Sequence, residues 1–516
     1  MKSYIKILFA WLVIGSFTGC DSLITDTPES MLIQDNFFTT QTHISEGVIG
    51  CYKGMCKVMD DDWKFTEMRS DNSCVAYVST SSGDRSDYCF MKFFNPPTSM
   101  PLMYNYWYEL FQNISNVNAV LPSVGAGSTY VSSEPLRAQY EGELLFIRAS
   151  HYFTLVNLWG DMFKITKVIG PLDAKTIGRS PAAEIYDDII FPDLIKAANQ
   201  LPASYSTSDI GRVTKWAAKA LLAKAYMQKG YLEDMPKAKA LLEEVIGATQ
   251  YCSLVQTKGT ATSAYANVFS VDNEMNPEII FAVRYNRLNS LGSSFWGTFA
   301  PDGSAMNIIK AGTPVGDNNP TPEFMSKFSD PSDTRKDACF RVWYKNASTP
   351  EYYISKYIDP GMVLALQAEN DWPVIRYSDV LLLHAELLAQ SNNPNDALAD
   401  VNKVRVRAGV QPYVSFDSKT EALDSVYQER RIELAFENHR WFDLLRMGRA
   451  YGDPNKALDI LKTAIFTTDW LTLYALFNKI APPVQSSFVI ERLLLPIPQQ
   501  EIDTNNKMVI PQNPGY

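Results

Sequence analysis

The chain has 516 residues, of which 46% are hydrophobic and 20% charged, and its formal net charge is −10 at pH 7. A chain of this length can bury a large core, in one domain or in several. Its negative charge, together with the lack of any lysine–arginine run, argues against nucleic acid as a partner, because phosphate groups would be repelled.

The first twenty residues have the pattern of a secretory leader. Two lysines precede an apolar run at residues 7–14, and small residues lead to Cys20. The run is too short to span a bilayer, which takes about 20 apolar residues. Gly19 before Cys20 resembles a bacterial lipobox, with Phe17 at the position usually taken by leucine. This implies that residues 1–19 are removed and that the lipidated Cys20 anchors the protein outside the cytoplasm. The alternative is plain secretion with an unmodified cysteine.

Helical spacing dominates the part from residue 37 to residue 249, which follows a polar tether at 20–36. Apolar stripes predict helices over residues 102–121, 134–158, 182–200 (with a break at Pro192), 213–229 and 236–247. The last two helices follow each other closely and have alanine at their contact positions. They therefore resemble a tetratricopeptide unit.

Residues 250–372 differ from the helical parts. Gly, Ser, Thr, Asn and Pro are dense there, and the apolar run 278–283 predicts a short strand. Loops of this length are usually functional, and the stretch near 63–100 has the same character. Helical spacing returns over 373–516, with helices expected from Pro373, over 398–408 and over 420–447. The sequence predicts a mainly α fold, with four tetratricopeptide-like helix pairs as a scaffold and an irregular, loop-rich part containing a few short strands.

An ordered series of segments resembles the SusD/RagB-like family of outer-membrane lipoproteins. The segments are Gly142–Ala149 with Leu158–Asp161, Trp372–Glu386, Val401–Gly409, Glu429–Arg446, Leu495–Asp503 and Gln512–Tyr516. The chain departs from the family pattern at Asn438, where glycine is common, and at Met162 and Phe163. Each motif alone is weak, but the ordered set covers nearly the whole chain and includes the lipobox.

The resemblance implies a binding protein without catalysis. Members of this family sit on the outer face of the outer membrane, cap a SusC-like TonB-dependent transporter and help to pass oligosaccharides, sometimes peptides, into it. We therefore expect an oligosaccharide and such a transporter as partners, contact with the membrane through the lipid anchor only, and no cofactor. The alternative is an envelope scaffold, or a peptide-binding relative, with no functional sugar site.

The ligand site is expected in the two loop-rich stretches, as in relatives of this family. Aromatic faces there can stack on sugar rings, while Asp, Asn and Arg bind the hydroxyl groups. Trp296 is the first candidate, because a large aromatic among small loop residues is poorly placed for the core. The other candidates are Arg284, Tyr285, Asn286 and Phe299 in the second stretch, and Trp63, Arg69, Asp71, Asn72, Tyr77 and Tyr88 in the first. Ordinary loop packing of Trp296 and turn capping by residues 69–72 are the competing interpretations.

The other conspicuous residues have structural interpretations. The charged residues of 429–443 recur every three or four positions, which predicts an ion network along a helix rather than a catalytic carboxylate pair. The clusters Asp60–Asp62 and Asp272–Glu274 could hold Ca²⁺, but solvated charge is favoured, because neither has the EF-hand glycine. Cys74 and Cys89 are the pair best placed for a disulfide, although free thiols are favoured. His384 is expected to be a core histidine.

Overall fold

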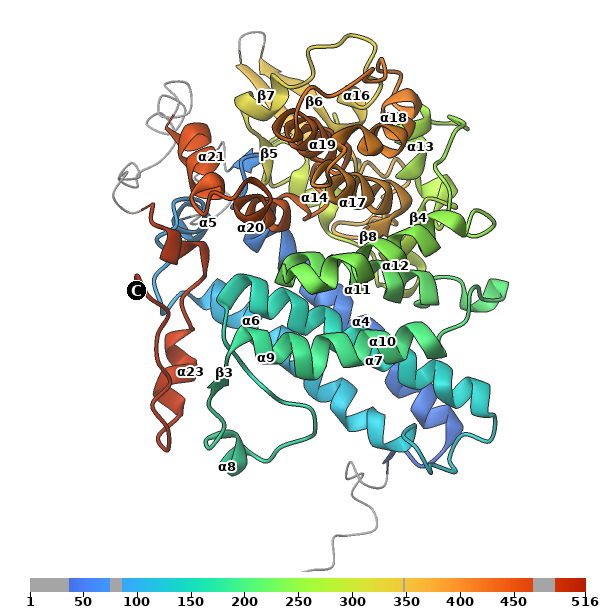
Figure 1. The fold of residues 1–516 in the computed structure, drawn as a ribbon, viewed down its shortest axis with the longest axis vertical. Helices are drawn as coiled ribbons and strands as arrows, with labels where there is room; N and C mark the ends of the chain where they lie inside the picture. Colours follow the sequence, from blue (N-terminus) through green and yellow to red (C-terminus); the bar gives the residue numbers. More distant parts are fainter. Residues whose placement is uncertain (1–36, 75–85, 347–348, 467–487) are drawn as a thin grey trace, which may run out of the picture.

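The structure is a computed structural model that describes residues 37–74, 86–346, 349–466 and 488–516. The leader, Cys20, the tether and Tyr77 lie outside the described residues. Helices predominate, as expected, and the irregular segment sits above the N-terminal helices in Figure 1.

The scaffold begins with α4 (Gln41–Phe65), which packs against α6 (Pro101–Val120) and α7 (Glu134–Trp159). Four consecutive helix pairs follow: α7 with α10 (Phe191–Gln200), α11 (Lys215–Lys229) with α12 (Met235–Gly247), α17 (Tyr377–Ala389) with α18 (Leu398–Arg407), and α19 (Lys419–Glu433) with α20 (Arg440–Tyr451). Neighbouring pairs touch through α10 and α11, α12 and α17, and α17 and α19. The predicted helical scaffold is confirmed.

Helices α4 and α6 approach closely at Gly54. A methyl group at this position would clash with the amide of Asn113 on α6. That amide is fixed, because its Nδ2 lies 3.0 Å from the Cys51 carbonyl oxygen and 2.8 Å from His151 Nε2 on α7. Because Gly54 has no side chain, the Asn113 amide can connect α4, α6 and α7.

The segment 182–200 is helical throughout, although a break was expected at Pro192. A π turn (Tyr186–Ile190) joins α9 (Ala182–Ile185) to α10. Proline lacks an N–H, and its ring crowds the carbonyl group four residues earlier, here that of Asp188. The wider turn directly before Pro192 accommodates the ring, so the helix continues.

Two predicted helix boundaries are wrong. The helix expected over 420–447 is two helices, because α19 ends at Glu433 and α20 begins at Arg440. Between them Phe436 (φ 63°) and Asn438 (φ 66°) have left-handed backbone, which asparagine tolerates better than most residues. Pro373 does not open a helix but lies in strand β8 (Trp372–Arg376), and α17 starts at Tyr377. Within the described ranges β8 pairs with β4 alone, so a residue without an N–H can be accommodated.

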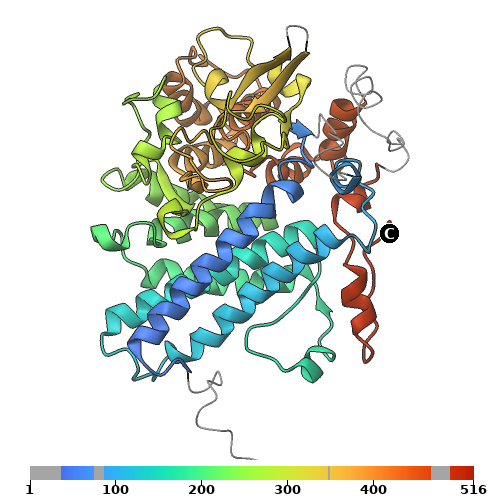
Figure 2. The ribbon, with the colours of Figure 1, turned by 180° about the vertical axis from the view of Figure 1, so that it is seen from behind.

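The strands are short and form two-stranded antiparallel sheets. Strand β4 (Ile279–Val283), predicted over 278–283, pairs with β8, and β6 (Phe340–Asn346) pairs with β7 (Thr349–Ile354). The other pairs are β1 (Ser73–Cys74) with β5 (Asn319–Pro320) and β2 (Met162–Phe163) with β3 (Arg179–Ser180). Val283 lies opposite Trp372, so the irregular segment leaves and rejoins the scaffold at the β4–β8 pair. Figure 2 shows this segment beyond the upper end of α4.

Short helices complete the fold. They are α5 (Ser86–Lys92), α8 (Pro171–Ala174), α13 (Ala264–Val268), α14 (Phe295–Phe299), α15 (Pro322–Met325), α16 (Lys336–Cys339), α21 (Lys456–Ile465) and α23 (Gln499–Thr504). The main core runs through the helical array, and a small second core lies within the irregular segment. Within the described ranges, no helix combines the length and the hydrophobicity needed to cross a bilayer.

No disulfide joins two cysteines of the described part, as favoured. Cys74 and Cys89 are both buried and are not joined. Burial raises the pKa of the Cys74 thiol to about 12.

Candidate functional site

A cleft of about 800 Å³ lies between α4, the segment 207–212 and the residues that follow β4. The predicted residues Arg284, Tyr285 and Asn286 line this cleft. Apolar side chains at its edge are strongly exposed, namely Ile49, Ile210 and Leu291. The volume lies within the range of about 300–1,000 Å³ that is typical of ligand sites.

Arg284 is held in place by two carboxylates. Its Nε lies 2.6 Å from Asp371 Oδ2, and its Nη2 lies 3.1 Å from Glu274 Oε2. Asp371 Oδ1 also accepts a hydrogen bond from the backbone N–H of Tyr285, at 2.9 Å. Burial raises the pKa of the Asp371 carboxyl, and the Arg284 guanidinium opposes that shift. The Arg284 side chain remains 37% exposed, so its guanidinium is available to a ligand.

Tyr285 supports the cleft rather than offering an open ring. It is 4% exposed, and its hydroxyl donates to the Cys56 carbonyl oxygen (3.2 Å) and to Asp60 Oδ1 (3.4 Å). Ser294 Oγ lies 3.5 Å from the same Asp60 oxygen. Burial, and then the charge of Asp61, raise the pKa of Asp60 to about 6. These bonds fix the end of β4 to α4.

The opposite wall was missed by sequence reasoning. Arg212 pairs with Asp209 (2.7 Å) and with Glu143 (3.0 Å), and the Tyr52 hydroxyl accepts from the backbone N–H of Val213 at 3.0 Å. Lys53 of α4 is exposed beside them. A signal existed in the polar linker Ser206–Arg212 between two strongly predicted helices, since linkers of this kind often carry binding residues.

Trp296 lies in the second core. Its side chain is 2% exposed and packs with Ile309, Met362 and Tyr353, whose ring is 6.2 Å away. The expectation that Trp296 stays outside the core is wrong. The chain is tightly packed just before Trp296, because a Cβ at Gly292 would come within 2.5 Å of the Gln367 backbone.

Phe299 and Trp63 are also buried in the protein core. Their rings meet edge to face at 5.3 Å, and both side chains are buried. The half-buried Tyr88 lies 6.0 Å from Trp63. Phe299 and Trp63 therefore offer no free face on which a sugar could stack.

Arg69, Asp71 and Asn72 are buried at the end of α4 and bind a distant segment. Asp71 forms a two-point ion pair with Arg440, at 2.7 and 2.9 Å. Burial alone would raise the pKa of Asp71, but the Arg431 and Arg440 guanidinium groups hold it well below its usual range. Neither sugar contact nor simple turn capping describes this cluster, since its bonds hold α4 to the α19–α20 region.

Asn72 and Arg69 also contact residues that lie far along the chain. Asn72 Oδ1 accepts from Arg431 Nε at 2.8 Å. The Arg69 guanidinium lies 4.1 Å from the Trp441 ring and donates to the Leu493 carbonyl oxygen at 3.1 Å. Both residues thus belong to the junction that contains Asp71.

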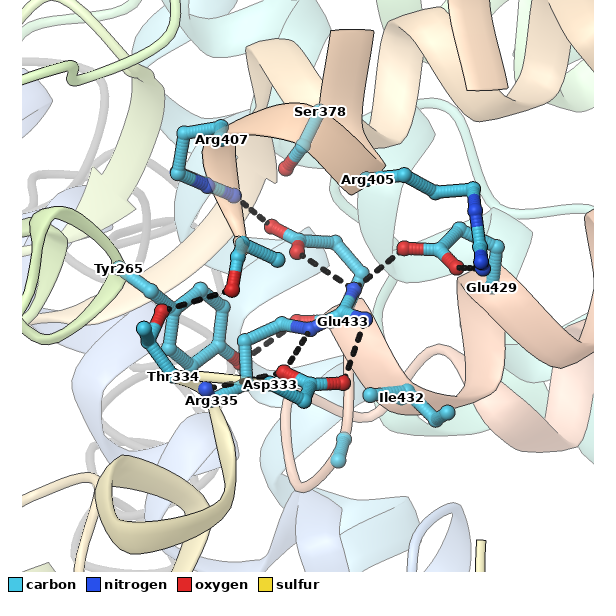
Figure 3. A network of polar contacts seen from close by, with 12 residues as sticks. Tyr265, Asp333, Thr334, Arg335, Ser378, Arg405, Arg407, Glu429, Ile432 and Glu433 are labelled. Atoms are coloured by element: carbon cyan, nitrogen blue, oxygen red, sulfur yellow. Dashed lines mark hydrogen bonds and ion pairs between the residues drawn. The ribbon is translucent and has the colours of Figure 1, made fainter. Parts of the chain in front are cut away.

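The charged segment around α19 forms a buried ion network, as expected, but Glu433 finds its partners on other elements rather than along one helix (Figure 3). Glu433 is paired with Arg335 (3.3 Å), Arg376 (3.1 Å) and Arg407. Burial alone would raise the pKa of Glu433, but these guanidinium groups lower it strongly. Arg335 also binds Asp333 (2.8 Å) and Glu429. The carboxylates drawn here are matched by cations, as a structural network requires.

Comparison with known proteins agrees with these features. Residues 342–516 match the family described as "SusD family", and residues 25–227 match "Starch-binding associating with outer membrane". SusD-like protein P25 of Formosa agariphila is 24% identical over 508 residues, covering 87% of this chain and 90% of the relative. SusD-like protein P38 of the same organism is 25% identical over 496 residues, covering 87% and 93%.

The chain belongs to the SusD/RagB-like family. Solved structures of similar fold include a "Laminarin binding SusD-like protein" (TM-score 0.70, 24% identity, 93% of this chain and 100% of that one). Another is surface glycan-binding protein A from Bacteroides thetaiotaomicron in complex with laminarihexaose (TM-score 0.72, 21% identity, 93% and 100%). At these identities the likeness concerns the fold.

The family segment Glu429–Arg446 contains Asn438 where glycine is common, and the structure gives the reason that asparagine fits. The backbone there is left-handed, with φ 66°. The side chain adds a contact that glycine lacks, because Asn438 Nδ2 donates to Asp62 Oδ2 at 2.8 Å. This departure from the family pattern therefore ties the turn to α4.

The acidic run of α4 and His384 have protein partners. Asp61 pairs with Lys64, and Asp62 also accepts from the Tyr106 hydroxyl. Among the described residues there is no group of three or more His, Cys, Asp or Glu side chains arranged to hold a metal ion.

His384 is buried, and its Nδ1 lies 2.6 Å from Asp400 Oδ2, as expected of a core histidine.

Proposed function

We propose that this protein is a cell-surface glycan-binding lipoprotein, which captures oligosaccharide and delivers it to a SusC-like TonB-dependent transporter. Family membership carries the proposal, because relatives with this fold are named for laminarin binding or were solved with laminarihexaose. The family matched by residues 25–227 is described as starch-binding and as associating with the outer membrane. The cleft beside α4 is the site that we assign to the ligand.

The chemistry of the cleft supports sugar binding. Arg284 and Lys53 donate hydrogen bonds, and Asn286 can both donate and accept, which suits vicinal hydroxyl groups. Tyr52, Ile210 and Leu291 offer apolar contact to the C–H faces of a ring. Asp60 accepts from Tyr285, and Asp371 pairs with Arg284. A structural role for both acids supports binding without catalysis.

Titration calorimetry with laminarin and other oligosaccharides tests the site, using the soluble Cys20→Ala chain. We expect the double variant Lys53→Ala/Arg284→Ala to weaken binding at least tenfold. Arg341→Ala is the matched control, because it removes an exposed arginine of β6 outside the cleft. Equal weakening by both variants would refute the assigned cleft. Failure to bind any glycan, with association to the transporter retained, would favour the scaffold alternative.

The anchor and the transporter need separate tests. Labelled palmitate should mark the native chain and not Cys20→Ala, and an antibody should detect the native chain on intact cells. The chain should co-purify with a TonB-dependent barrel from solubilised outer membranes. An unlabelled protein found in the cytosol would contradict the proposed location.

A further inference from the structure

A second chamber, of about 90 Å³, is lined mostly by buried side chains and lies next to the cleft. It is bounded by α4, α7, α11, β8 and the turn before α20. Its lining includes Met55, Ser150, Lys224, Asn438 and His439. Met55 also lines the cleft, so the two spaces share this side chain.

The tautomer of His439 follows from its neighbours. Lys224 Nζ lies 2.7 Å from His439 Nδ1. Burial lowers the pKa of Lys224, but the Asp379 carboxylate, whose Oδ2 lies 3.6 Å from the same nitrogen, opposes that shift and favours the ammonium form. An ammonium group only donates, so Nδ1 must accept. Burial, and then the charge of Lys224, lower the pKa of His439 to about 3, so the ring is neutral at pH 7. Its remaining proton is therefore on Nε2.

Two adjacent residues that line the chamber each have one buried polar atom without a protein partner. His439 Nε2 is a donor, and Asn438 Oδ1 is an acceptor, because Asn438 Nδ2 is turned to the Asp62 carboxylate. Neither atom has a hydrogen-bond partner in the described part of the protein. Both side chains are more than nine-tenths buried. A buried donor and a buried acceptor in one chamber are both satisfied by a ligand that can accept and donate.

We propose that the chamber is a water-binding site, in which ordered water accepts from His439 Nε2 and donates to Asn438 Oδ1. A single water needs a cavity of about 10–15 Å³, so this chamber has room for several. An apolar occupant would leave both polar atoms unsatisfied, and a simple cation or anion would satisfy only one. The asparagine at position 438 supplies the acceptor.

A high-resolution crystal structure of the Cys20→Ala chain, with and without xenon pressure, tests the proposal. We expect ordered water at about 2.7–3.2 Å from both atoms and no xenon in the chamber. Xenon in the chamber, or no water beside either atom, would overturn it, because dry apolar cavities take up xenon.

The variant Asn438→Gly supplies the matched comparison, since glycine accepts the left-handed backbone at this position. The water at Nε2 should remain and the contact to residue 438 should disappear. A long-range ¹H–¹⁵N spectrum of histidine-labelled protein gives a second readout, which needs no crystal. It should show His439 protonated on Nε2, and a proton on Nδ1 would refute the assigned donor.

Discussion

The Glu67 carboxylate accepts a hydrogen bond of 3.2 Å from the backbone N–H of Asn438, which lies 371 positions later in the chain. The same carboxylate accepts from the backbone N–H of Phe436 (3.3 Å) and from Asn72 Nδ2 (3.0 Å). Phe436 and Asn438 are the two left-handed residues of the turn between α19 and α20. The end of α4 therefore holds the turn that breaks the C-terminal helix.

We expect Glu67→Gln to destabilise the protein by about 1–3 kcal/mol, because an amide N–H would face the backbone N–H of Asn438. Burial raises the pKa of Glu67 to about 7 in the folded protein, above its ordinary value of 4.5. The folded state then holds this proton more tightly than the unfolded state, so Glu67 makes stability fall as the pH rises from about 4.5 to 7. Urea unfolding at pH 5 and pH 8 measures this, and the fall should be smaller in the variant. The same pH dependence in both proteins would contradict the prediction.

Arg376 is expected to be among the most sensitive core positions. It binds Glu437 (2.6 Å), Glu278 (2.5 Å) and Glu433 (3.1 Å). Arg376→Met would leave these buried carboxylates with less positive charge, at a cost of about 3–5 kcal/mol. Denaturant unfolding gives the value. Lys239→Met, which breaks the exposed pair with Glu243, should stay close to the parent protein and serves as the control. A parent-like Arg376→Met would show that the network contributes little to stability.

Trp296→Ala should act on stability and not on glycan binding. Removing this buried side chain from the second core should cost about 3–5 kcal/mol. Thermal unfolding measures that loss, and calorimetry well below the melting temperature should show binding unchanged. Tyr344→Ala is the control, since that aromatic side chain is exposed on β6. Lost binding with an unchanged melting temperature would restore Trp296 as a ligand contact.

The buried thiols should resist alkylation in the native protein. Burial raises the pKa of Cys51, Cys74 and Cys252 to about 12, and the thiolate is the form that reacts. We expect iodoacetamide at pH 8 to label these three residues only after unfolding, as read by peptide mass spectrometry. Rapid labelling of native Cys74, or its recovery in a disulfide with Cys89, would contradict this prediction.

The sequence revealed the helices whose signal is local. The apolar stripe over 102–121 corresponds to α6, and that over 134–158 corresponds to α7, because helical spacing is set by neighbours within a few residues. The break after Glu433 was hidden, since the left-handed turn depends on the distant Glu67. Local patterns therefore predicted elements well but not the interruptions that tertiary contacts impose.

The candidate site was predictable only in part, for the same reason. Arg284 and Asn286 follow a recognisable strand and do line the cleft. Asp71 has the appearance of a loop residue, but its partner Arg440 lies 369 positions away. Trp296 was placed outside the core because its neighbours are small, while its packing partners Tyr353 and Met362 come much later in the chain.

The pairing of Val283 with Trp372 places the two ends of residues 284–371 side by side. Evolution or engineering can exchange a segment that leaves and returns at one place while the surrounding chain keeps its course. In this protein such an exchange must preserve two ion pairs. Arg335 of this segment pairs with Glu429 of the scaffold, and Lys356 pairs with Glu437. A graft that carries a different cleft must therefore bring a cation to each of these two positions.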